Sequence, residues 1–183
     1  SHKGTAGTET LNVSLQAVLN YRDGRKREKK FRSFIFREGD KVMQIKNNYD
    51  IGWQKNGVEG FGVYNGDIGI IRSIDLTAQS MTIDFDGRMA IYDFAMTEEL
   101  ELAYAITVHK SQGSEWSAVV IPVCSFPAML MTRNLLYTAV TRGKKLVILV
   151  GSPESVAQMV RNNKLQTRYS LLKKRLVEAV AND

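Results

Sequence analysis

The chain has 183 residues and a net charge of +6, and with 44% hydrophobic and 24% charged residues it can bury a core in one large domain or two small ones. No apolar stretch approaches the roughly 18 residues of a membrane-spanning helix, and a single cysteine, Cys124, excludes an internal disulfide. We therefore expect a protein of the reducing cytoplasm without a membrane partner.

A helix is expected to begin near Thr8, which is the candidate N-cap. The apolar residues that follow share one face at helical spacing: Leu11, Leu15, Val18 and Leu19. Asn12 and Gln16 fall on the polar face. The pattern predicts that the helix buries its apolar stripe.

The charge is concentrated directly after this helix. The stretch from Arg22 to Arg32 holds seven basic and two acidic residues, a net charge of +5, which leaves +1 for the rest of the chain. Such a run can contact a phosphate backbone as an auxiliary site, or it can be a solvated flexible loop. Both interpretations stay open.

Residues 37–98 have the composition of a small β-domain, because they contain eight of the fourteen glycines and several Asn-Gly or Asp-Gly pairs. Met81, Ile83 and Phe85 alternate with polar residues, and Asp86-Gly87 then turns the chain. Short strands at such spacing predict a small barrel.

The pattern changes again from about residue 99. The runs 119–123 and 146–150 are continuously apolar, which is typical of strands buried on both faces, and Met129 to Arg142 has helical spacing between them. This order predicts a βαβ unit in a parallel sheet, with ligands near the carboxyl ends of the strands. Ser152-Pro153 is a good start for a helix over 154–161, and a last amphipathic stretch runs from Thr167 to Val180.

The segment Thr107-Val-His-Lys-Ser-Gln-Gly-Ser-Glu115 is rich in small and polar residues directly before a buried strand. Four of its side chains can donate hydrogen bonds to phosphate oxygens, namely those of Thr107, His109, Lys110 and Ser111. Gly113 permits a close backbone approach. The segment is therefore a candidate phosphate-handling loop.

A second candidate segment, Leu136-Tyr-Thr-Ala-Val-Thr-Arg-Gly-Lys144, places Arg142 at the end of the predicted crossover helix. A cation at this position complements the helix dipole, which is one explanation for it. Nowhere does the chain contain a G-x-x-x-x-G-K-[ST] loop that could cradle a nucleotide's phosphates. With two histidines and one cysteine, a metal site is not expected either.

These two segments resemble motifs V and VI of the second motor domain of superfamily 1 DNA helicases, in the RecD/TraA branch that includes exodeoxyribonuclease V alpha subunits. Two further stretches, 37–49 and 63–70, are similar to the SH3-like barrel called 2B in that branch. The resemblance implies an α/β fold, in which a RecA-like parallel sheet with covering helices (domain 2A) is interrupted by a small SH3-like β-barrel insertion. We place the first part of 2A at residues 1–36, the barrel at 37–98 and the remainder at 99–183, and Ser1-His2 is typical of an expression remnant.

By the same resemblance the parent protein is an ATP-dependent helicase of DNA repair and recombination that translocates 5′ to 3′ on single-stranded DNA. ATP with Mg²⁺ binds between this domain and an N-terminal motor domain of the same parent chain, and other recombination or repair subunits are further candidate partners. Because the chain lacks its own phosphate loop, we expect it to bind no cofactor and hydrolyse no ATP by itself.

The resemblance also implies roles for individual residues. Thr107 and His109 become contacts to the DNA backbone, with Lys110 and Ser111 beside them. Gln112, Gly113 and Glu115 face the nucleotide cleft, and Arg142 becomes an arginine finger that neutralises charge on the transferring γ-phosphate. In the barrel, Trp53 is a candidate platform for base stacking, although aromatic residues in so small a barrel more often form its core.

Two alternatives remain. The chain can be a stand-alone module that binds nucleic acid, or the helicase part of a conjugative relaxase. A pure binding module predicts that residues 104–116 and 137–142 are scattered in space. The helicase hypothesis predicts that they converge at one edge of the sheet.

Overall fold

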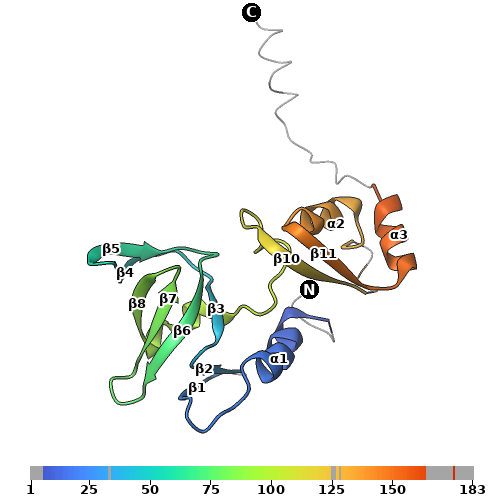
Figure 1. Ribbon diagram of the computed structural model, residues 1–183. Coiled ribbons are helices and arrows are strands. Elements are labelled where there is room, and N and C mark those ends of the chain that lie inside the picture. The colour runs from blue at the N-terminus through green and yellow to red at the C-terminus, as the bar shows by residue number, and fades with distance from the viewer. Residues whose placement is uncertain (1–5, 33, 125–126, 128, 164–174, 176–183) are drawn as a thin grey trace, which may run out of the picture.

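A computed structural model describes residues 6–32, 34–124, 127, 129–163 and 175. The chain forms a β-domain and a smaller α/β part, and in the view of Figure 1 the first helix lies below the α/β part. Ser1-His2 and, apart from Arg175, the helix expected over 167–180 lie outside the described residues.

The first helix, α1 (Thr8–Leu19), forms where it is expected, but Gly7 is its N-cap and not Thr8. The prediction of its buried face is wrong in part, since Leu11 and Leu15 are half-buried and the other two residues of the apolar stripe are not. Asn12 and Gln16 are buried, whereas Val18 and Leu19 are 76% and 66% exposed. The polar side is buried because each of its amides finds hydrogen-bond partners across the contact, as described below.

The basic run continues into a hairpin that packs on the β-domain. It consists of β1 (Glu28–Phe31) and β2 (Phe34–Arg37), which pair antiparallel. Part of the run is therefore a strand and not a solvated loop. Arg27 Nη1 donates to the Ile74 carbonyl at 3.0 Å, and Lys29 Nζ lies 4.2 Å from the centre of the Phe94 ring.

The β-domain is a seven-stranded antiparallel sheet in the order β5-β4-β8-β7-β6-β3-β9. Its elements are β3 (Lys41–Gln44), β4 (Asn48–Lys55), β5 (Val58–Val63), β6 (Ile68–Asp75), β7 (Ser80–Phe85), β8 (Arg88–Asp93), a 3-10 helix η1 (Phe94–Glu99) and β9 (Leu100–Leu102). The sheet extends beyond the expected boundary at residue 98, and β2 adds Phe36 to the same core.

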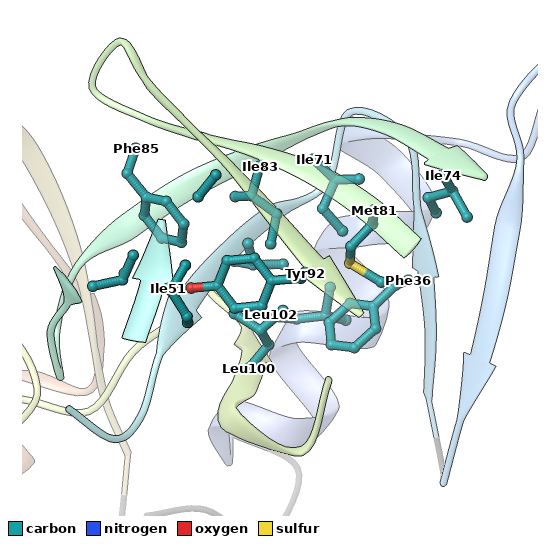
Figure 2. Close-up of a cluster of buried hydrophobic side chains, with 13 residues drawn as sticks. Phe36, Ile51, Ile71, Ile74, Met81, Ile83, Phe85, Tyr92, Leu100 and Leu102 are labelled. Carbon is teal, nitrogen blue, oxygen red and sulfur yellow. The ribbon is translucent and has the colours of Figure 1, made fainter. Parts of the chain in front are cut away.

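The alternating pattern of β7 is confirmed, since Met81, Ile83 and Phe85 are buried and the residues between them are not. Asp86 and Gly87 both have positive φ and join β7 to β8 in a two-residue turn. Figure 2 shows the resulting core, in which Tyr92 lies among aliphatic and aromatic side chains from several strands.

The α/β part contains the predicted βαβ unit. Strands β10 (Trp116–Val123) and β11 (Gly143–Gly151) are parallel, and the crossover helix α2 (Arg133–Val140) is shorter than the expected 129–142. After β11, Ser152 caps α3 (Pro153–Arg161) by accepting a hydrogen bond from Ser155 N, as the sequence predicts.

The prediction that both strands are buried on both faces is wrong. One face packs under α2 and α3, where Val123 joins a core with Met131, Leu136 and Met159. The other face is open, and its exposed apolar side chains include Val120, Leu146, Ile148 and Val150. Within the described residues the parallel sheet has these two strands only, and the other two sheets are antiparallel. The RecA-like core is thus seen in part, because the described helices cover one face of it.

Candidate nucleotide and DNA interface

The segment from Thr107 to Gly113 forms a compact turn before β10. Thr107 Oγ1 accepts from Lys110 N at 3.2 Å, and the Thr107 carbonyl accepts from Ser111 N at 3.1 Å. Ser111 is buried, and its hydroxyl donates to the Val108 carbonyl at 2.7 Å. Ser111 therefore holds the turn together, and its hydroxyl is turned away from solvent.

The same turn presents other side chains outward. His109 and Gln112 are exposed, and Gly113 has a φ of +84° with no atom within 4 Å of the position of a Cβ. Lys110 Nζ is held 2.5 Å from Glu101 Oε2 at the end of the β-domain. An outward imidazole and an open glycine backbone suit contact with an extended, charged ligand.

Arg142 lies against the end of this segment. Its guanidinium donates from Nη1 to the Ser114 carbonyl at 3.0 Å, from Nε to the Thr138 carbonyl at 3.2 Å and from Nη2 to Thr141 Oγ1 at 3.3 Å. The side chain is half-buried, and these contacts use three of its five N–H groups. They fix the plane of the guanidinium and leave two donors.

The two candidate segments converge at one end of the β10–β11 pair. Trp116 N donates to the Arg142 carbonyl at 2.8 Å, and Trp116 stands opposite Gly143 in the strand register. Glu115 Oε2 and Lys144 Nζ form an ion pair of 3.1 Å beside them. The helicase hypothesis predicts that the two segments converge, whereas a pure binding module predicts that they are scattered.

This end of the sheet is not the one the sequence predicts. Both segments immediately precede their strands, so the candidate site lies at the amino ends of β10 and β11, whereas open α/β sheets commonly bind ligands at the carboxyl ends. The prediction came from the general topology of parallel sheets. It differs from the structure because the candidate residues precede their strands in the chain.

Trp53 does not join this group. It lies on β4, packs against the core of the β-domain and faces Gly60 across the strand pair, with the Arg88 guanidinium 5.7 Å from its ring centre. Its Nε1 is buried without a hydrogen-bond partner. The aromatic side chains most open to solvent in this region are Tyr49 and Phe61, at 65% and 73% exposure.

Sequence reasoning missed the residues that hold the segment before the turn. Asn12 Nδ2 donates to the Ala105 carbonyl at 3.0 Å, and Ala105 N donates to Asn12 Oδ1 at 2.8 Å. Tyr104 OH donates to Asp40 Oδ1 at 2.9 Å. A signal was present, because Asn12, Gln16 and Asn20 recur every four residues, the same spacing that marks an apolar face.

Within the described residues, no three His, Cys, Asp or Glu side chains gather in a way that could hold a metal ion. None of the described helices is long and apolar enough to cross a bilayer.

Two protein families match the chain. The family described as the SH3 domain of ATP-dependent RecD-like DNA helicases matches residues 11–85, and the UvrD-like helicase C-terminal domain matches residues 102–150. The second match includes the turn 107–113 and Arg142.

Relatives agree with these matches. The ATP-dependent RecD2 DNA helicase of Deinococcus radiodurans is 32% identical over 95% of this chain, which is 22% of the relative. The RecBCD enzyme subunit RecD of Mycolicibacterium smegmatis is 30% identical over 95% of the chain and 28% of its own length. The RecD subunit of Mycobacterium tuberculosis is 37% identical over 53% of the chain and 17% of its own length.

The chain thus spans 22% of the length of the Deinococcus relative and 28% of the length of the Mycolicibacterium relative. Both family matches, and the identity along nearly the whole sequence, point the same way as the convergence of the two candidate segments. The chain therefore carries the SH3 domain of ATP-dependent RecD-like DNA helicases, followed by a C-terminal helicase domain of the UvrD-like type.

Proposed function

We propose that this chain is the C-terminal motor part of an ATP-dependent DNA helicase, in which it supplies contacts to single-stranded DNA and an arginine finger. The observation that carries the proposal is the contact between Arg142 Nη1 and the Ser114 carbonyl, because it joins the two candidate segments at one edge. ATP with Mg²⁺ would bind between this edge and an N-terminal motor domain that holds the phosphates.

Arg142 is suited to act on a nucleotide held by another domain. Its guanidinium is oriented by three hydrogen bonds and keeps two N–H groups that can reach a γ-phosphate oxygen. Bound ATP supplies the transferring phosphoryl group, whose charge a planar guanidinium stabilises better than an ammonium. Gln112 and Gly113 lie near the same edge and are exposed, so they are proposed to face the nucleotide.

The DNA contacts are proposed for the outward part of the turn. His109 is exposed, and Thr107 and Lys110 are half-buried beside it, each with one polar atom engaged inside the protein. Ser111 would act through the shape of the turn, since its hydroxyl is used within it. A step in which the domains close on ATP would move this turn along the DNA backbone.

The proposal is tested by replacing Arg142 with Ala and with Lys in the chain joined to its N-terminal motor domain. An arginine finger contributes about 10³–10⁵-fold to turnover, so we expect both variants to lose DNA-stimulated ATPase by roughly that order. Binding to single-stranded DNA, measured by fluorescence anisotropy, should change less than about twofold, because Arg142 contacts the nucleotide in this proposal.

Arg133→Ala is the matched control, since Arg133 is an exposed arginine at the start of α2, away from the converging segments. Its ATPase should equal that of the unaltered protein. Near-normal turnover in Arg142→Ala would remove the arginine-finger assignment. Robust hydrolysis by the 183-residue chain alone would contradict the shared ATP site.

A further inference from the structure

Asp40 is fully buried between α1 and the β-domain, and its carboxylate accepts four hydrogen bonds. Oδ1 accepts from Asn20 Nδ2 at 2.7 Å and from Tyr104 OH at 2.9 Å. Oδ2 accepts from Gln16 Nε2 and from Arg37 N, both at 2.6 Å. We call Gln16, Asn20, Arg37, Asp40 and Tyr104 the polar hub.

The polar hub joins three separate segments of the chain. Gln16 and Asn20 belong to α1 or its end, Arg37 and Asp40 to the entry of the β-domain, and Tyr104 to the segment that leads into the turn 107–113. The Arg37 guanidinium adds a bond from Nη1 to the Asn20 carbonyl and one from Nε to Glu28 Oε1 at 2.7 Å. A shift of any segment would break bonds held by the others.

Beside the polar hub, Asn12 fixes the chain two residues before Thr107. Its side-chain amide makes a pair of hydrogen bonds with the backbone of Ala105, at 2.8 and 3.0 Å. Asn12, Gln16 and Asn20 occupy one face of the same helix, so α1 holds the β-domain and the segment before the turn at the same time. The helix acts as a common frame for both.

The chemistry of the polar hub favours one geometry. Burial raises the pKa of Asp40, and its hydrogen bonds to Asn20, Tyr104, Arg37 and Gln16 oppose that effect. Burial and the neighbouring Asp40 raise the pKa of Tyr104 to about 12, so the phenol remains a proton donor at neutral pH. Because the donors come from all three segments, the carboxylate makes all its hydrogen bonds only when the three segments are in place. Removing one donor leaves a buried carboxylate oxygen with one hydrogen bond fewer.

We propose that the polar hub and Asn12 are positioning residues that make the β-domain and the turn 107–113 move as one body on single-stranded DNA. The inference rests on the proposed function, because it assigns the DNA contacts to that turn. None of these residues needs to touch the DNA. They set where His109 and Lys110 stand relative to the β-domain, so that a shift of one part carries the other with it.

The test uses the 183-residue chain with a fluorescent deoxythymidine oligonucleotide, at a temperature well below unfolding for every variant. Tyr104→Phe removes one hydroxyl and Asn12→Ala removes the amide pair. We expect each to weaken oligonucleotide binding roughly tenfold, within the range of coupling found inside a hydrogen-bond network. Hydrogen exchange at the amides of Ala105, Lys110 and Ser111, which donate to Asn12 Oδ1, Thr107 Oγ1 and the Thr107 carbonyl, should speed up in both variants.

Two controls separate positioning from stability. Ile74→Val trims a fully buried side chain of the β-domain core and lowers stability without touching the polar hub. Tyr21→Phe removes a hydroxyl from a tyrosine that is 64% exposed. Both should bind the oligonucleotide as the unaltered chain does and keep its exchange rates at the amides of Ala105, Lys110 and Ser111.

The experiment distinguishes failure of this inference from failure of the proposed function. If the unaltered chain does not bind the oligonucleotide, the DNA assignment fails, and the exchange rates alone decide whether the polar hub positions the turn. If Tyr104→Phe and Asn12→Ala bind normally, or if Ile74→Val changes binding and exchange as much as they do, the polar hub only stabilises the fold and the inference is overturned.

Discussion

Single residues in the β4–β5 hairpin show how a glycine can decide the place of an aromatic ring. Trp53 lies across the strand pair from Gly60, and a Cβ at position 60 would stand 2.4 Å from Trp53 Cζ2. Phe61 similarly lies over Gly52, where a Cβ would be 3.7 Å from its ring. The glycine at position 60 lets Trp53 pack on the core, which is why the more exposed rings of this hairpin are others.

Gly60→Ala is therefore expected to destabilise the chain. The added methyl cannot coexist with the Trp53 ring, and overpacking of this kind typically costs about 1–3 kcal/mol. Chemical denaturation should show a lower midpoint. Gly24→Ala is the control, because no atom lies within 4 Å of its Cβ position, and its effect should stay within about 0.5 kcal/mol. Equal midpoints for the two variants would contradict the packing argument.

At the scale of an element, α1 departs from the usual rule of amphipathic helices, because its amide side chains are more deeply buried than its apolar ones. Its amide side chains face the β-domain and its valine and leucine side chains at 18 and 19 face solvent. Hydrophobic burial alone favours the opposite orientation. The observed orientation prevails because Asn12, Gln16 and Asn20 together make hydrogen bonds to a buried carboxylate and to three backbone carbonyls.

The burial of the polar side predicts that replacing a polar residue of α1 lowers stability more than replacing an apolar one. Gln16→Leu removes donors to Asp40 Oδ2 and to the Ile35 carbonyl, and we expect it to lower the free energy of unfolding by at least about 1–3 kcal/mol. Val18→Gln changes a side chain that is 76% exposed and should stay within about 0.5 kcal/mol.

Urea unfolding followed by helical circular dichroism measures both substitutions. An ordinary apolar stripe predicts the opposite order, with the polar residue at 16 replaceable and the valine at 18 essential. A greater loss of stability in Val18→Gln than in Gln16→Leu would show that the stripe faces the core after all.

At the scale of the whole molecule, the α/β part leaves one face of its sheet open. Val120 stands opposite Ile148 and Pro122 opposite Val150 in the parallel register, so their side chains form a continuous apolar surface. Val120 is 64% and Val150 52% exposed. Surfaces of this kind mark contact sites or cause association.

We expect the folded chain to bind an apolar dye such as anilinonaphthalene sulfonate on this open face. Val120→Thr combined with Val150→Thr should reduce the dye fluorescence substantially and leave the melting temperature nearly unchanged, because both side chains are already in water. Val58→Thr makes the same change at a position that is 63% exposed in the β-domain. Equal reductions in the two proteins would show that the dye does not report on the β10–β11 face.

Much of the local structure could be predicted from the sequence. The β7–β8 hairpin follows from alternation ended by Asp86-Gly87, and the start of α3 follows from Ser152-Pro153. The two candidate segments could also be found, since their unusual residues are contiguous. What failed was the assignment of faces, for α1 and for β10–β11, because a face becomes buried only when a partner from elsewhere covers it.

Side chains a few positions apart specify the turns, the strand order of the βαβ unit and the identity of the candidate residues, so these features can be predicted from the amino-acid sequence. Long-range packing, in contrast, brings Arg142 to Ser114, surrounds Asp40 with donors from three segments and buries the polar face of α1. Asp40 and Tyr104 are 64 residues apart, and Asn12 and Ala105 are 93 apart. Contacts at such separations arise from packing of the whole chain, which local periodicity does not encode.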